Sequence, residues 1–174
     1  MFTLRFWACI SLSCLSASLW AGEANAQSCL VLSPPKFAPN GSVTLELSLF
    51  SLPGKAPAAV QWTLQYTSSN ITKLIVDDGP ALALARKTAL CSGNANAYNC
   101  LVAGSNANAI GNGIVAKLTV GLVAGTAAAP ISIYSPLGVS GEGYFVPVSS
   151  KVVHNPGAGL SPIASQGCEG RGLK

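Results

Sequence analysis

The chain has 174 residues and a formal net charge of +4; 49% of its residues are hydrophobic and only 9% are charged. This length fits one domain rather than several. The basic residues are scattered, and only Arg86 and Lys87 are adjacent. This distribution excludes the basic stripe that a nucleic-acid-binding protein presents.

The first 26 residues have the three regions of a secretory signal peptide. Arg5 supplies the positive charge, residues 6–21 are largely apolar, and Ala24-Asn25-Ala26 is a small-x-small cleavage site. We predict cleavage before Gln27, which leaves a secreted mature chain of 148 residues, extracellular or periplasmic. A membrane anchor is the alternative, but the serine-interrupted apolar stretch falls short of the ~20 residues that span a bilayer. No later segment is long and apolar enough, so we expect no membrane span after cleavage.

Four cysteines remain in the mature chain. An even number in an exported protein indicates disulfides, and four cysteines allow three pairings. We favour Cys91–Cys100, which closes a short loop, and Cys29–Cys168, which ties the two ends of the domain together. The alternative is a metal site. The cysteine spacing does not match a zinc ribbon, and the sole histidine, His154, has no partner at ligand spacing.

Apolar and polar residues alternate with a period of two in several segments, which predicts half-buried strands. The clearest are Ser42–Phe50, Val60–Tyr66 and Ile114–Val123, each with one apolar face. Less regular strands are expected at Ile71–Val76, Tyr98–Gly104, Ala129–Val139 and Tyr144–Val153.

The segment Ala81–Leu90 is ambiguous because Ala, Leu, Arg and Lys favour helix and Pro80 suits a first helical turn. We expect a short helix or flap near residues 80–87, running into a strand near Lys87–Cys91. Before it, Asp77-Asp78-Gly79-Pro80 is predicted to be a turn that ends the preceding strand.

About nine short strands separated by turn signals predict an all-β sandwich or barrel. Because each strand has one apolar face, two sheets packed face to face are the economical arrangement. We place the domain at residues 27–155. Residues 156–174 are rich in Gly, Ser and Pro and are expected to form an irregular tail, tied back by the Cys29–Cys168 disulfide.

Three segments resemble the strand patterns of cohesin domains: Val60–Tyr66 followed by Ile71–Leu74, Tyr98–Gly104, and Asn112–Val120. The likeness covers roughly Cys29 to Val153. It implies a nine-stranded jelly-roll sandwich, related to carbohydrate-binding modules, that docks a dockerin-like protein partner through one sheet face. The outward residues expected on that face are Gln61, Thr63, Gln65, Asn99, Leu101, Ser132 and Tyr134.

The resemblance also bears on the disulfides. It implies that Cys91 and Cys100 face each other across a hairpin. It further implies that the first and last strands are parallel neighbours, although Cys168 lies well past the last strand and the tail must fold back to reach Cys29. Cohesins normally sit in multidomain scaffolds, whereas this chain carries one such domain without a dockerin-like calcium loop, so a scaffold role is less expected.

The mature chain shows no arrangement typical of catalysis, and we expect a non-enzymatic protein without a cofactor. Asp77 and Asp78 are the one adjacent acidic pair, and they are weak candidates for a calcium site, which needs six or more oxygen ligands. Glycoside hydrolysis needs two carboxylates across a cleft, and nothing in the sequence brings Glu46 and Glu142 together. His154 is interpreted as a loop residue.

Two other functions compete with protein docking. A carbohydrate-binding module acting in polysaccharide catabolism would need a planar row of exposed aromatic residues. Trp62 faces inward on its strand, and Tyr98, Tyr134 and Tyr144, the remaining candidates, do not fall on one strand. The other alternative is a structural subunit of the cell envelope or matrix whose edge strands pair with neighbours.

Overall fold

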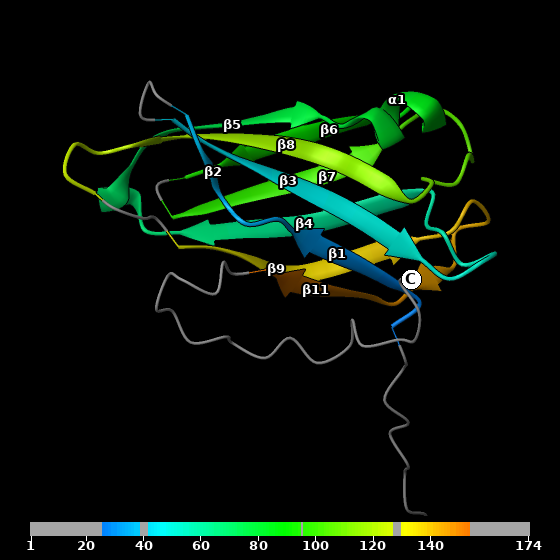
Figure 1. The fold of residues 1–174 in the computed structure, drawn as a ribbon. Coiled ribbons are helices and arrows are strands. Elements are labelled where there is room, and N and C mark those ends of the chain that lie inside the picture. Colours follow the sequence, from blue (N-terminus) through cyan, green and yellow to red (C-terminus); the bar gives the residue numbers. More distant parts are fainter. Residues whose placement is uncertain (1–25, 39–41, 95, 127–129, 154–174) are drawn as a thin grey trace, which may run out of the picture.

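A computed structural model describes residues 26–38, 42–94, 96–126 and 130–153, which form two stacked β-sheets (Figure 1). Sheet A has the strand order β11-β1-β3-β8-β5, with β2 paired to β3, and sheet B has the order β10-β9-β4-β7-β6. The strands of sheet A are β1 (Ser28–Leu32), β2 (Lys36–Phe37), β3 (Ser42–Ser51), β5 (Ile71–Asp78), β8 (Gly113–Leu122) and β11 (Val148–Val152). Those of sheet B are β4 (Ala59–Tyr66), β6 (Thr88–Gly93), β7 (Ala97–Ala103), β9 (Ile131–Val139) and β10 (Phe145–Val146).

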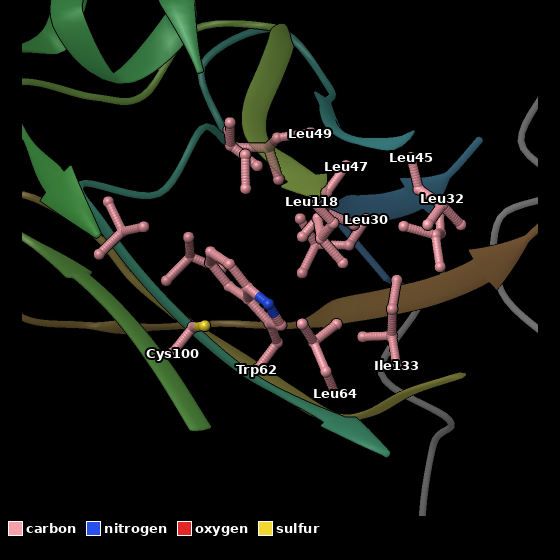
Figure 2. Close-up of a cluster of buried hydrophobic side chains, with 14 of the residues drawn as sticks. Leu30, Leu32, Leu45, Leu47, Leu49, Trp62, Leu64, Cys100, Leu118 and Ile133 are labelled. Atoms are coloured by element: carbon pink, nitrogen blue, oxygen red, sulfur yellow. The ribbon is translucent and has the colours of Figure 1, made fainter. Parts of the chain in front are cut away.

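The period-two patterns become the inner faces of the two sheets, which confirms the predicted all-β sandwich. On β3 every second residue from Val43 to Leu49 is buried, and on β4 Val60, Trp62 and Leu64 are buried in the same way. These side chains meet in one core between the sheets (Figure 2). Burial of this apolar surface is the main force that holds the sheets together.

The ambiguous segment forms a short helix followed by a strand, as predicted. Helix α1 (Pro80–Ala85) begins with Pro80 in its first turn and is capped after Ala85 by Arg86, whose backbone is left-handed with φ of 56°. Its inner side buries Leu82 completely, so the helix closes one end of the sandwich. A 3-10 turn, η1 (Ser68–Asn70), connects β4 to β5.

The predicted turn at Asp77-Asp78 is wrong, because both residues belong to β5, which runs to Asp78. Asp77 is paired in register with Lys117 of β8, and Asp78 with Ala116. The next residue, Gly79, lies outside the strand, and a Cβ there would lie 2.2 Å from the Ile114 carbonyl oxygen. Backbone crowding at Gly79 and the following Pro80 therefore set the boundary.

The single strand predicted at Tyr144–Val153 is also wrong. It is divided into β10, which pairs with β9 in sheet B, and β11, which pairs in parallel with β1 in sheet A. Pro147 stands between them, and proline cannot donate a ladder hydrogen bond in a strand interior. The chain crosses from one sheet to the other at this residue. The parallel pairing of the first and last strands agrees with what the cohesin resemblance implies.

One predicted disulfide is confirmed: Cys91 and Cys100 are bonded, with their Cα atoms 4.1 Å apart. They are register partners on β6 and β7, and Cys100 lies on the inner face beside Trp62 (Figure 2). The Cys29–Cys168 bond stays a prediction, because Cys168 lies outside the described residues. The signal peptide and the tail at 156–174 also lie outside them.

Among the described residues, no helix has the length and apolar character needed to cross a bilayer.

Candidate functional site

The outer face of sheet B consists of cross-strand rows that the register fixes. One row joins Leu90 of β6, Leu101 of β7, Gln61 of β4 and Leu137 of β9. The next row is more polar and joins Ser92, Asn99, Thr63 and Tyr134 on the same four strands. Because side chains of paired residues point to the same side of a sheet, each row is continuous across the face.

Large apolar side chains on this face are exposed to solvent. Leu90 is 68% exposed and Phe145 of β10 is 62% exposed, and the others are Leu101, Tyr134 and Leu137. Five of the nine exposed large hydrophobic residues of the described chain thus lie on this one face. Singly scattered apolar residues are ordinary, whereas a contiguous group marks an interaction surface.

Polar side chains without charge fill the other outward positions. The Thr63 hydroxyl donates to Asn99 Oδ1 at 2.7 Å, which fixes the neighbouring side chains of β4 and β7. Gln65 is paired with Ser132, and Gln61 lies between Leu101 and Leu137. The five strands of sheet B, all within the described residues, contain no charged residue. The face combines hydrogen-bonding groups with apolar area, as the core of a protein interface does.

The seven residues expected to form the binding face all lie on this outer face, and none points into the core. Sequence reasoning missed three apolar members, Leu90, Leu137 and Phe145. The alternation Thr88-Leu90-Ser92 was a usable signal for the first. The other two were hidden by irregular backbone, because Ser135 has a φ of 46° and Pro147 interrupts the last run.

The tyrosines do not form a row. Tyr134 is 58% exposed on the outer face of β9, whereas Tyr98 packs against the core from β7. Tyr144 is exposed but lies before β10, in the turn after β9. The planar aromatic platform that a carbohydrate-binding face requires is therefore not assembled by these three side chains.

The acidic residues are dispersed. Asp78 Oδ1 accepts the backbone N–H of Ala89 at 2.8 Å, and Glu46 lies 3.4 Å from the Lys36 ammonium on sheet A. Glu142 belongs to the turn between β9 and β10, where it accepts the Ser140 hydroxyl. The described residues contain no group of three or more His, Cys, Asp or Glu side chains arranged to hold a metal ion. His154 lies outside them.

Comparison with known proteins places this geometry in a class. No family model and no curated protein matches the sequence. Among solved structures the chain is similar to cohesin modules, so the described residues have a cohesin-like jelly-roll sandwich fold, as the strand patterns predicted.

Three of these structures illustrate the likeness. The sixth cohesin of Acetivibrio cellulolyticus scaffoldin B, solved in complex with a Cel5 dockerin, gives a TM-score of 0.62 at 15% identity over 75% of this chain and 99% of that one. The cohesin of a Clostridium thermocellum OlpA cohesin–dockerin complex gives 0.60 at 13% identity over 74% and 99%. A non-cellulosomal cohesin of the archaeon Archaeoglobus fulgidus gives 0.54 at 13% identity over 74% and 88%.

Proposed function

We propose that the mature chain is a secreted, non-enzymatic module that docks a protein partner, of the dockerin-like class, through the outer face of sheet B. The observation that carries this proposal is the row of exposed apolar side chains on a face whose strands have no charge. The cohesin-like fold supports it, because similar cohesins are solved in complex with dockerins.

The physical reason is the cost of leaving this face bare. Leu90, Leu101 and Leu137 expose apolar surface to solvent. A partner that covers them stabilises the complex by roughly 25 cal/mol for each Å² of apolar surface removed from water. Asn99 and Gln61 beside them donate and accept hydrogen bonds, which fix the partner's register without the desolvation penalty of a buried charge. A protein surface of matching shape would satisfy both groups.

The polysaccharide alternative is less favoured, because Tyr98 is half-buried and packs against the core, and Tyr134 and Tyr144 lie apart on β9 and in the turn after it. Binding assays on soluble and insoluble polysaccharides separate the two functions. Retention that is lost in Tyr134→Ala but kept in Leu101→Asp would favour a glycan, and would contradict the docking proposal.

The direct test is a pull-down from the secreted proteins of the source organism on immobilised mature chain. A Leu101→Asp variant places a charge at the centre of the apolar row. Phe37→Asp is the matched control, since Phe37 is 61% exposed on β2 of the other sheet. We expect a protein that is retained by the wild type and by Phe37→Asp. Leu101→Asp should lower the affinity for this protein at least tenfold.

Equal retention by all three forms would overturn the proposal, because binding would then not involve sheet B. The captured protein is identified and its binding segment expressed alone. A dockerin-like segment that binds with a 1:1 stoichiometry would support the narrower form of the proposal. A hydrolase activity of the mature chain that disappears in Asp78→Ala would contradict the non-enzymatic assignment.

A further inference from the structure

A second site is built around Lys87, the residue between α1 and β6. The residue is only 6% exposed, although lysine is almost never buried without a charged partner. It lines a cavity of about 140 Å³ together with small residues, chiefly Ala58, Ala103 and Gly104. Gly104, Ala107 and Gly141 on the rim are exposed, so the cavity reaches the surface.

The ammonium group of Lys87 has unused hydrogen-bonding capacity. Its Nζ donates to the backbone carbonyl of Asn106, which uses one of three N–H donors. In the part of the chain that the structure describes, the one ion pair within 4.0 Å joins Lys36 to Glu46, so no carboxylate pairs with Lys87. The nearby Glu142 is exposed and is held by the Ser140 hydroxyl instead.

The surrounding backbone holds the lysine side chain in place. Asn106 Nδ2 donates to the Arg86 carbonyl at 3.0 Å, and its Oδ1 accepts the Asn108 N–H at 3.0 Å. Gly104 leaves room for the side chain, since a Cβ there would lie 2.9 Å from Lys87 Cδ and 2.8 Å from the Arg86 carbonyl oxygen. The cation is therefore positioned, and the small lining residues leave the space beside it open.

We propose that this cavity binds a carboxylate group, with the Lys87 ammonium as its charged partner. A buried cation without a counter-charge is unfavourable, and a carboxylate compensates it through charge-assisted hydrogen bonds. The cavity has room for several water molecules, and a carboxylate displaces them. The site adjoins the docking face, because Ala59 and Ala103 border both, but the proposed carboxylate binding does not depend on docking.

The carboxylate has two possible sources, a free small acid or an acidic side chain of a protein. Both share the chemistry that the site recognises, and two probes separate them. Acetate represents the free acid, and acetamide, its uncharged analogue, is the control. N-acetyl-glutamate methylamide represents the side chain on a peptide backbone, with the glutamine analogue as its match.

The test is a titration of the isotope-labelled mature chain, disulfides intact, followed through the Lys87 methylene and Asn106 amide NMR signals. Sodium chloride keeps the ionic strength constant. We expect saturable shifts with a carboxylate, with a Kd on the order of millimolar, as befits a ligand of few atoms. The amides should give no such shifts. Saturation by acetate alone indicates a free acid, and saturation by both carboxylates indicates that a protein side chain fits.

Three variants complete the design. Lys87→Met should weaken binding more than tenfold, while Lys117→Met, which removes an exposed lysine on β8, should leave it unchanged. Because Lys87→Met also removes the bond to Asn106 and can unfold the loop, Ala103→Leu fills the cavity with the lysine kept and should abolish the shifts.

Two results would overturn the proposal: no saturation by either carboxylate up to roughly 100 mM, or equal shifts with the amides. Either would mean that Lys87 serves only to anchor the loop through Asn106. Docking through sheet B is measured separately with Leu101→Asp, so failure of one proposal leaves the other standing.

Discussion

The two outer faces of the sandwich cover the same core but differ in charge. Sheet A presents six charged side chains on its outer face, at Lys36, Glu46, Lys73, Asp77, Lys117 and Lys151. Sheet B presents none, and carries exposed leucines instead. Inward positions must be apolar on both sheets because they build the core. Outward positions are free of that demand, so the two outer faces can differ in charge without a change in the core.

The charges of sheet A also alternate in sign across neighbouring strands. Asp77 of β5 is paired with Lys117 of β8, which is paired with Glu46 of β3, and Glu46 contacts Lys36. Alternating charge keeps a sheet face soluble and unattractive to other proteins. Sheet A thus carries the charged outer face, and sheet B carries the exposed apolar side chains on which the docking proposal rests.

The most severe way to break the comparison is to remove the core on which both faces rest. Trp62 is fully buried on the inner side of sheet B, and Trp62→Ala should lower the free energy of unfolding by about 3–5 kcal/mol. Chemical denaturation followed by circular dichroism measures it. Tyr134→Ala, an exposed aromatic on the same sheet, is the control and should change stability by less than about 0.5 kcal/mol. Similar losses in the two variants would contradict the assignment of Trp62 to the core.

A second change acts on sheet B alone. Replacing Cys91 and Cys100 together by alanine removes a crosslink over 9 residues. Chain-entropy estimates give a loss of about 2–3 kcal/mol for a loop of this size. Amide hydrogen exchange should become faster in β6 and β7 through local opening. In β1 and β3 of sheet A it should increase only as much as the loss of global stability requires. Uniform acceleration in both sheets would show that the bond stabilises the whole domain rather than this edge.

A third change tests the link between the sheets. The Asp78 carboxylate on β5 accepts the Ala89 N–H on β6, which ties the edges of sheets A and B together. Asp78→Ala should cost about 1 kcal/mol, the usual net contribution of a hydrogen bond. Asp78→Asn keeps an acceptor oxygen and should recover part of the loss. If thermal unfolding finds the two variants equally unstable, the bond to Ala89 is not the cause.

The smallest effect is expected on the outer face of sheet A. Lys36 and Glu46 form an exposed pair at 3.4 Å, and such pairs contribute about 0.2–1 kcal/mol. A double-mutant cycle with Lys36→Met and Glu46→Gln measures the coupling. It should shrink at high salt, since exposed charges are screened. A coupling above that range, unchanged by salt, would mean that the pair is more protected from solvent than its exposure indicates.

Much of the sandwich follows from local patterns. The alternation around Leu47 and Leu64 fixes which residues face inward, and Pro80 marks the start of the helix. The Asp77-Asp78 turn failed because turn preference is a local tendency, whereas the strand gains cross-strand partners on β8. The division at Pro147 had a local signal in the sequence, because proline has no N–H to donate to a strand ladder.

The candidate sites were predictable to different degrees. Gln61, Thr63 and Asn99 could be placed on one face because alternation and the cohesin resemblance together set the register. Burial of Lys87 could not be foreseen, since the residues that cover it, Gly104 and Asn106, come from a loop remote in sequence. No local pattern distinguishes this lysine from its exposed neighbour Arg86.

The parallel pairing of β1 with β11 sets the order in which the domain can be completed. Ser28 is aligned with Val148, so the first strand lacks one of its neighbours until nearly the whole domain has been synthesised. Contacts between segments so distant along the chain form slowly. The pairing of β11 with β1 is therefore the last contact of sheet A that can form, and it joins the two ends of the described domain.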